Sequence, residues 1–257
     1  MSRTHNIHAL DFIRVNVSAD FRLEAAQNRL GIFWWFMEPL MMMAIFYTVF
    51  GLILERGGEG FVYYLLVGIS SWLWFAATVT RTMHSITRSA RLIQQIYIPK
   101  YLLPCVAVCV ECLKSFIVFG LLLLLLAGLN GITFSWFYLP VIFITQLLFS
   151  AACGVVMAAL VPFVNDLKFV VQLGLRALMF LSGVFFLIDD RIPEPYASYL
   201  MLNPMANIIT EFRSVLVDDT APTWTTIASI NGLSIALLVI GFALIKHFDR
   251  RYPRVLL

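Results

Sequence analysis

The chain has 257 residues, of which 61% are hydrophobic and 13% charged, with a formal net charge of +3. Its mean hydropathy of +0.87 lies outside the range of soluble globular domains and indicates several membrane spans. The composition therefore excludes one or two soluble domains. We expect an all-α membrane protein in which residues 1–257 form a single transmembrane domain.

The first thirty residues contain no apolar stretch like the core of a signal peptide, so we expect no cleaved leader. Residues 20–30 carry too many charges to cross a bilayer, but apolar residues are spaced among them. This pattern predicts an amphipathic helix that lies on the membrane surface and leads into the first span. We therefore expect residues 1–31 to be cytoplasmic or interfacial.

Six stretches reach the roughly twenty apolar residues that a helix needs to cross the hydrocarbon core. Of the 18 Lys and Arg residues, thirteen fall in connections on one side, three in connections on the other side and two inside spans. The positive-inside rule then places both termini in the cytoplasm, including a tail at 247–257. The predicted spans are 33–54, 61–80, 102–129, 138–163, 170–188 and 226–246.

The second span has an aromatic and hydroxylic stripe that contact with lipid does not require. Its members fall in one narrow sector when each residue turns the helix by about 100°. Two interpretations stay open: the stripe packs against small residues of another helix, such as Ser150, Gly154 and Ala158, or it lines a passage for a hydrated, uncharged chain. The candidate lining residues are Tyr64, Ser71, Phe75, Thr78 and Thr82, with Gly68 among them.

The connection at 81–101 is rich in cations and ends in a pair of prolines around the start of the third span. Helical spacing predicts a short amphipathic helix here. Such a helix is typical either of a segment that rests on anionic lipid or of a docking element for a soluble protein. Its apolar face would hold Leu92, Ile93 and Ile96, and its polar face Arg88, Arg91 and Gln95.

Four ionisable residues lie inside predicted spans. Glu111 and Lys114 are three residues apart on one helix face, so we expect them to pair. Arg176 lies about two turns from a cytoplasmic end, where its side chain can reach the interface. Glu38 is too shallow for a central proton site. Lys114 and Arg176 are candidate cytoplasmic entrance charges that meet lipid phosphate, with a paired or snorkelling structural role as the alternative.

No motif for nucleotide hydrolysis, zinc peptidase chemistry or a serine nucleophile is present in the sequence. All four cysteines fall within predicted spans, and their single CxxC has no second pair or histidine nearby, so we expect no metal site. The chain is therefore predicted not to be an enzyme. Uphill transport would draw its energy from a partner or from an ion gradient.

The longer connection on the outer side, 189–225, breaks after the fifth span and restarts at Asn203-Pro204, a favourable helix start. A helix over 204–217 is too short for a full crossing. We interpret the connection as a re-entrant hairpin on the outer face, and an ordinary amphipathic linker is the alternative.

Several local patterns together resemble the ABC type-2 permease family, in particular the membrane subunits that export O-antigen or capsular polysaccharide. They occur in the family's order and cover nearly the whole chain. The matching segments are 29–34 with 38–40, 92–93 with 97–100 and 103–104, 180–184, 192–193 and 202–205 with Glu211 and Arg213.

The resemblance implies a six-span half-transporter that forms a homodimer and binds two copies of a separate cytoplasmic ATPase. That partner, and not this chain, would bind ATP and Mg²⁺. The resemblance also implies that residues 88–98 form the coupling helix that docks into the ATPase. The residues placed at this contact are Arg88, Arg91, Leu92, Ile93, Ile96 and Tyr97.

The same resemblance implies that 189–217 forms the exit gate of a channel in a bacterial inner membrane. Its gate residues are Pro193, Asn203, Pro204, Ile208 and Phe212. The expected cargo is a lipid-linked polysaccharide, membrane lipids are further partners, and no nucleic acid is involved. The alternatives are an ABC exporter of teichoic acid, lipid or a drug, a carrier driven by an ion gradient, and a membrane enzyme of glycan assembly.

Overall fold

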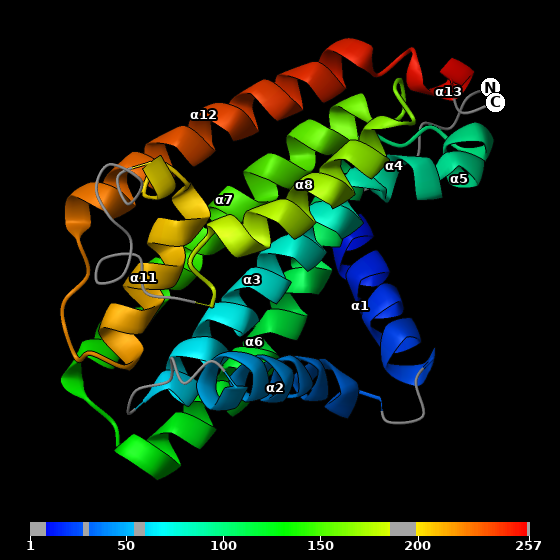
Figure 1. The fold of residues 1–257 in the computed structure, drawn as a ribbon. Helices are drawn as coiled ribbons and strands as arrows, with labels where there is room; N and C mark the ends of the chain where they lie inside the picture. Colours follow the sequence, from blue (N-terminus) through cyan, green and yellow to red (C-terminus); the bar gives the residue numbers. More distant parts are fainter. Residues whose placement is uncertain (1–8, 28–30, 54–59, 186–198, 256–257) are drawn as a thin grey trace.

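A computed structural model describes residues 9–27, 31–53, 60–185 and 199–255. The described residues are helical with connecting turns, and no strand occurs among them. Long helices form one bundle, with short helices gathered at its ends (Figure 1). The predicted all-α membrane fold is therefore confirmed.

Within the described residues, five helical segments are long and apolar enough to cross a membrane. They agree with five of the six predicted spans to within a few residues. Three of these segments are single helices: α3 (Phe61–Met83), α6 (Leu102–Asn130) and α12 (Trp224–Phe248). The segment Phe33–Ile53 consists of α2 (Phe33–Phe46) and η1 (Tyr47–Ile53). The segment Phe134–Leu160 consists of η2 (Phe134–Tyr138) and α7 (Leu139–Leu160).

The fifth predicted span, 170–188, is represented by α8 (Leu167–Leu181). Its 15 residues correspond to about 22 Å of helix, which is shorter than the hydrocarbon core. Residues 186–188 lie outside the described part of the chain. Six full crossings therefore stay a prediction.

The centre of the bundle is the contact between α3 and α7, and α12 packs along the other side of α7. Two glycines of α7 and α12 permit these close approaches. A Cβ at Gly154 would lie 2.7 Å from the Cβ of Thr82 on α3, and one at Gly241 would lie 2.9 Å from Val155 on α7. Small residues thus bring α3, α7 and α12 together, as is common between helices in membranes.

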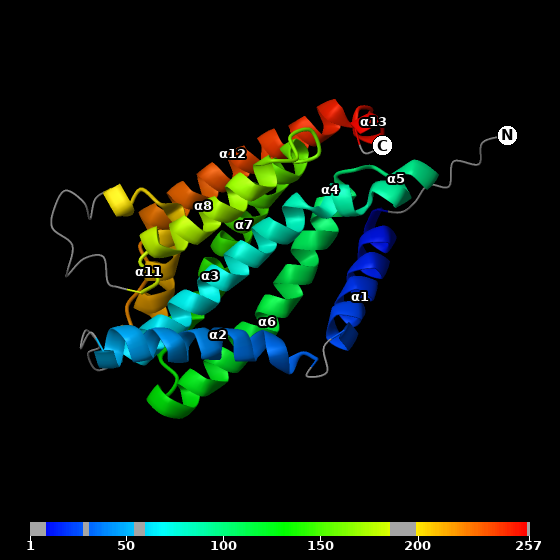
Figure 2. The same cartoon turned by 45° about the vertical axis from the view of Figure 1, so that its right-hand side comes forward.

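α2 lies obliquely across α3 and α6 and buries little of its own surface (Figure 2). Pro39 is its buried residue. Past Phe46 the helix widens into the π-helix η1, in which the ring of Tyr47 occupies the space beside Gly51. The rings of Phe46 and Phe50 both contact Phe185, with the Phe46 and Phe185 centroids 4.0 Å apart.

Short helices gather at one end of the bundle, which we call the α5 end (Figure 2). They are α4 (Ser85–Arg88), α5 (Ala90–Gln95) and α13 (Tyr252–Val255). Ile86, Ile93 and Tyr252 from these helices share one apolar cluster with Val155, Ala158 and Ala159 of α7 and Ile245 of α12.

The N-terminal helix α1 runs from Ala9 to Gln27, so it begins eleven residues earlier than the predicted segment. It packs along α6 through Val17, Val106 and Val110. α1 is thus bound to the side of the bundle near the α5 end, as well as carrying the charges expected of a surface helix (Figure 2).

The opposite end of the bundle holds α11 (Pro204–Leu216). As predicted, Asn203 caps this helix: its Oδ1 accepts a 3.0 Å hydrogen bond from the backbone N–H of Met205, and Pro204 is the first helical residue. α11 packs against α3 and α7 through buried residues that include Ile208 and Phe212. The path of the re-entrant hairpin across 186–198 lies outside the described residues.

Candidate functional site

A hollow of about 560 Å³ opens between α3 and α8. Its walls combine an aromatic ring, hydroxyl and amide groups and one guanidinium group, all within a membrane-embedded bundle. We call it the α3–α8 groove. It is lined by Trp72, Ala76 and Thr80 on α3 and by Gln172, Leu175, Arg176, Met179 and Phe180 on α8.

The groove places Arg176 beside hydrogen-bonding and aromatic side chains, as expected for contact with a polar, extended ligand. Arg176 is exposed, and the side chains of Thr80 and Gln172 are partly exposed. No ion pair involves Arg176 among the described residues. Its charge is therefore available to a ligand or to lipid.

The predicted lining residues occupy a different face of α3, rotated by about 100° from the groove. Ser71 is fully buried and donates a 2.9 Å hydrogen bond to Oε1 of Gln146 on α7, whose amide nitrogen donates 2.7 Å to the Ser71 carbonyl. Phe75 stacks on Phe149 at 5.6 Å, and Thr78 is fully buried. These contacts correspond to the interpretation in which the stripe packs against another helix.

Two further predicted lining residues also have partners in the bundle. Thr82 is fully buried and contacts Gly154. Tyr64 donates a hydrogen bond to Asp218 at the α11 end. A lining role for this stripe would require α3 and α7 to separate. The stripe alone does not reveal that it packs against α7, because its hydrogen-bond partner Gln146 is 75 residues away in sequence.

The predicted pair of Glu111 and Lys114 is present, with 2.6 Å between Nζ and Oε1. The pair belongs to a larger group of charges that joins α1, α3 and α6. Arg81 on α3 forms an ion pair with Asp20 at 2.9 Å and another with Glu24, and Lys114 reaches Glu24 at 3.0 Å. Three carboxylates and two cations therefore fix α1 to the bundle.

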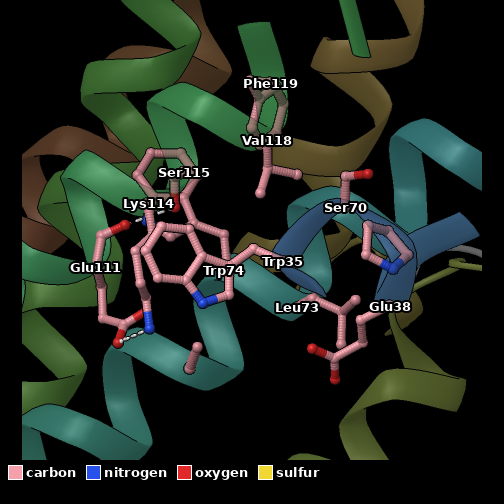
Figure 3. A pocket seen from close by; sticks show the side chains of 12 residues that line it. Trp35, Glu38, Ser70, Leu73, Trp74, Glu111, Lys114, Ser115, Val118 and Phe119 are labelled. Carbon is pink, nitrogen blue, oxygen red and sulfur yellow. Dashed lines mark hydrogen bonds and ion pairs between the residues drawn. The ribbon is translucent and has the colours of Figure 1, made fainter. Parts of the chain in front are cut away.

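Lys114 borders a small cavity of about 90 Å³ between α2, α3 and α6 (Figure 3). Its Nζ lies 5.6 Å from the ring centroid of Trp35, a cation–π geometry. Because Lys114 already contacts two carboxylates, the structure gives it the paired structural role. Of the two candidate entrance charges, Arg176 is the one that faces an open groove.

The predicted single helix over 88–98 is wrong in its extent. Two short helices, α4 and α5, meet at Ser89, and α5 ends at Gln95. Ile96 has extended backbone angles (φ −138°, ψ 149°), close to the start of the Pro99 turn. Ile96 therefore does not share a face with Ile93, which is buried in the bundle.

The exposed residues at the α5 end nevertheless form a compact surface. Arg88, Arg91, Ile96 and Tyr97 are exposed, and Leu92 is partly exposed. Tyr97 donates a 3.3 Å hydrogen bond to Asp249, whose carboxylate raises the pKa of Tyr97. Lys100, which is buried, pairs with the same carboxylate at 3.4 Å. The connection is thus fastened to the end of α12.

The predicted gate residues divide into two groups. Asn203 and Pro204 start α11 at the surface of the bundle, and the Asn203 amide also donates 2.7 Å to Ser182. Ile208 and Phe212 are fully buried and pack against α3 and α7. Pro193 lies outside the described residues.

Arg213 is a functional candidate that the sequence analysis counted among the cations of one side and within a segment that resembles the family, without assigning it a role. It is 5% exposed, and its guanidinium donates hydrogen bonds of 2.8–3.2 Å to the carbonyls of Tyr64, Gly183 and Val184. Those carbonyls come from α3 and from the end of α8. Arg213 therefore joins α11 to both helices that form the groove.

Together the bundle and the groove define an integral membrane protein with the features of a transport subunit. The family model described as ABC-2 type transporter matches residues 12–217, which is most of the chain. The chain belongs to the ABC-2 type transporter family.

Curated relatives match at low identity over long stretches. The O-antigen export system permease protein RfbA of Klebsiella pneumoniae is 24% identical over 252 residues, covering 97% of this chain and 96% of the relative. A protein of the same name from Myxococcus xanthus is 25% identical over 212 residues, covering 81% of each chain. The polysialic acid transport protein KpsM of Escherichia coli is 23% identical over 235 residues, covering 88% of this chain and 89% of the relative.

Proposed function

We propose that the chain is the membrane-spanning subunit of an ATP-driven exporter that moves a lipid-linked polysaccharide, of the O-antigen or capsule type, across the inner membrane. The observation that carries the proposal is the match to polysaccharide export and transport proteins along nearly the whole chain. The α3–α8 groove supports it, because it has the chemistry that a sugar chain needs.

In the groove, the exposed ring of Phe180 offers an apolar face on which a sugar ring stacks, while Thr80 and Gln172 exchange hydrogen bonds with hydroxyl groups. Arg176 faces the phosphate that joins such a chain to its lipid. Because the contacts are spread along the groove, a polymer slides through without being held at one tight site.

We further propose that two copies of the chain face each other to enclose a passage between their grooves. α2 and α8 expose apolar side chains in the single chain, including Met41, Ile45, Leu173 and Phe180. A second copy or lipid covers such surfaces in a membrane. α11 would then gate the outer end, and both termini would lie in the cytoplasm.

The exposed surface at the α5 end is proposed as the contact for the cytoplasmic ATPase, which binds ATP and Mg²⁺. Movement of that surface would pass to α7 and α12 through the apolar cluster that holds Ile86, Ile93 and Tyr252.

The test is export of surface polysaccharide by cells in which variants of the chain replace the original. Arg176→Gln and Gln172→Leu should lower export at unchanged protein level, and Arg22→Gln, which removes an exposed cation of α1 that does not line the groove, serves as the control. Full export by both groove variants would remove the groove from the proposal. Failure of an ATPase to co-purify with the chain in mild detergent would overturn the proposal as a whole.

A further inference from the structure

A second cavity, of about 110 Å³, lies at the α5 end between α1, α4 and α6. It is separate from the α3–α8 groove, and its lining is divided in character. Its apolar lining residues include Phe12, Leu92 and Leu103. Its polar and charged lining residues are Asn16, Asp20, Arg81, Ser85, Arg88 and Ser89.

Ser85 presents a hydroxyl group whose hydrogen-bonding capacity is unused. The residue is 8% exposed, and its Oγ has no hydrogen-bond partner among the described residues. A buried hydroxyl without a partner costs free energy, so a ligand atom or water is expected beside it.

Of the two cations that line this cavity, one has carboxylate partners and the other has none among the described residues. Arg81 is neutralised, because Asp20 pairs with it at 2.9 Å and Glu24 pairs with it as well. Arg88 has no ion pair within the described ranges and lies at the surface of the cavity. Arg88 is therefore the cation in this lining that is available to an anion.

The neighbouring His84 reports the same positive potential. Its pKa is lowered by burial and then by the charges of Arg88 and Lys168. An anion between α1 and α4 would offset these charges.

We propose that this cavity binds the phosphate of an anionic phospholipid. Arg88 would contact the phosphate oxygens, Ser85 and Ser89 would donate hydrogen bonds, and the apolar lining residues would cover the glycerol end of the acyl chains. The combination of an unpaired cation with apolar side chains in one cavity favours a lipid head group over free inorganic phosphate. The site rests on contacts of this chain alone and does not depend on the proposed cargo.

A bound lipid would join α1 to the surface where the ATPase is proposed to dock. It would occupy Arg88 and leave Arg91, Ile96 and Tyr97 for the protein partner. The lipid would thereby fix the position of α4 relative to α1 and α6.

The experiment uses the full chain in nanodiscs of phosphatidylcholine, without ATPase or cargo, with phosphatidylglycerol added in steps and bound lipid counted by native mass spectrometry. Arg88→Gln should weaken the tightest phosphatidylglycerol binding about fivefold, the effect of losing one cation near a membrane surface. Ser85→Ala should weaken it by a smaller factor. Arg91→Gln is the matched control, because Arg91 is exposed on the same connection but does not line the cavity.

Equal lipid binding by Arg88→Gln, Ser85→Ala and Arg91→Gln would overturn the proposal. A parallel series with inorganic phosphate in pure phosphatidylcholine identifies the source of the phosphate group. Protection of the chain against thermal unfolding by phosphate alone, without an effect of phosphatidylglycerol, would refute the lipid assignment. Arg88→Lys keeps the charge and should retain most of the binding, which separates ligand contact from a loss of folding.

Discussion

The hydroxyl of Tyr252 donates a 3.1 Å hydrogen bond to the backbone carbonyl of Ala159, linking the short C-terminal helix to the end of α7. Ala159 lies in the last turn of α7, where carbonyl groups have no partner within the helix. Tyr252 is fully buried, and its ring contacts Phe163 with the centroids 5.1 Å apart. Burial also raises the pKa of Tyr252, so the hydroxyl stays protonated and able to donate.

Tyr252→Phe removes this hydrogen bond and keeps the ring. We expect a loss of about 1–2 kcal/mol in the free energy of unfolding, because the Ala159 carbonyl remains buried without its partner. Thermal unfolding in detergent, followed by loss of the monodisperse chromatographic peak, measures the change. Tyr138→Phe serves as the control, because Tyr138 lies at the opposite end of the bundle in η2. An unchanged midpoint for Tyr252→Phe would contradict the capping role.

The contact between α3 and α7 depends on the absence of a side chain at residue 154. Gly154→Ala should destabilise the chain by about 1–3 kcal/mol, because its Cβ would lie 2.7 Å from the Cβ of Thr82. Gly120→Ala provides the matched comparison: it lies in α6, and no atom stands within 4 Å of the added methyl group. The same unfolding assay should show a lower midpoint for the first variant and an equal or higher one for the second.

Arg213→Met should uncouple α11 from α3 and α8. The substitution leaves the carbonyls of Gly183 and Val184 without their charged donor, at an expected cost of about 2–3 kcal/mol. Arg213→Lys should retain only part of this stability, since an ammonium group lacks the planar guanidinium geometry that reaches several carbonyls. The rate of limited proteolysis, compared between the variants, measures the loosening of the end of the bundle that holds α11. Equal cleavage of all three proteins would show that Arg213 does not hold this end together.

Asp249 fastens the connection before α6 to the end of α12 by accepting from Tyr97 and pairing with Lys100. Asp249→Asn should lower stability by about 1–3 kcal/mol, because the buried Lys100 loses its counter-charge. If the α5 end receives movement from an ATPase, the variant complex should also hydrolyse more ATP for each polysaccharide exported. Asp166→Asn is the control, since Asp166 is an exposed carboxylate at a neighbouring turn. A normal ratio of export to hydrolysis would limit Asp249 to a structural role.

His84 makes the stability of the folded chain depend on pH. Burial and the charges of Arg88 and Lys168 lower its pKa below the ordinary 6.5, so the unfolded chain takes up a proton at a higher pH than the folded chain does. Stability contributed by neutral His84 is complete above pH 6.5 and declines as the pH falls below that value. His84→Asn should flatten the fall in unfolding temperature between pH 7.5 and 5.5. His247→Asn controls for loss of a histidine as such, and an equal fall in both variants would refute the assignment.

The long helices could be predicted from the sequence because the need to cross a bilayer fixes their length and apolar character. The pairing of Glu111 with Lys114 also follows from spacing within one helix. The further partners of this pair, Glu24 of α1 and Arg81 of α3, meet it through tertiary packing. A count of charges along the chain carries no information about that meeting.

The orientation of α3 also could not be predicted from the sequence. A polar stripe in a membrane helix predicts that some partner is present, but Ser71 finds Gln146 of α7 and becomes buried. The groove is formed by the adjacent stripe, whose Trp72 and Ala76 carry no polarity that periodicity detects. The break between α4 and α5 at Ser89 could not be predicted either, because the helical spacing of apolar residues continues through Ser89 although the helix itself is interrupted there.

The π-helical turn after Phe46 has an effect on how this span tolerates changes in length. A π-helix holds an extra residue in each turn, so the side chains within it are displaced around the axis compared with those of an uninterrupted α-helix. Deleting one residue between Tyr47 and Ile53 would let the helix continue as α-helix and keep the same number of turns. Phe50 would then leave the ring of Phe185, and a different residue would take its place. The segment thus works as a local length buffer, in which a single lost residue tightens the winding of the helix and leaves the length of the span nearly unchanged.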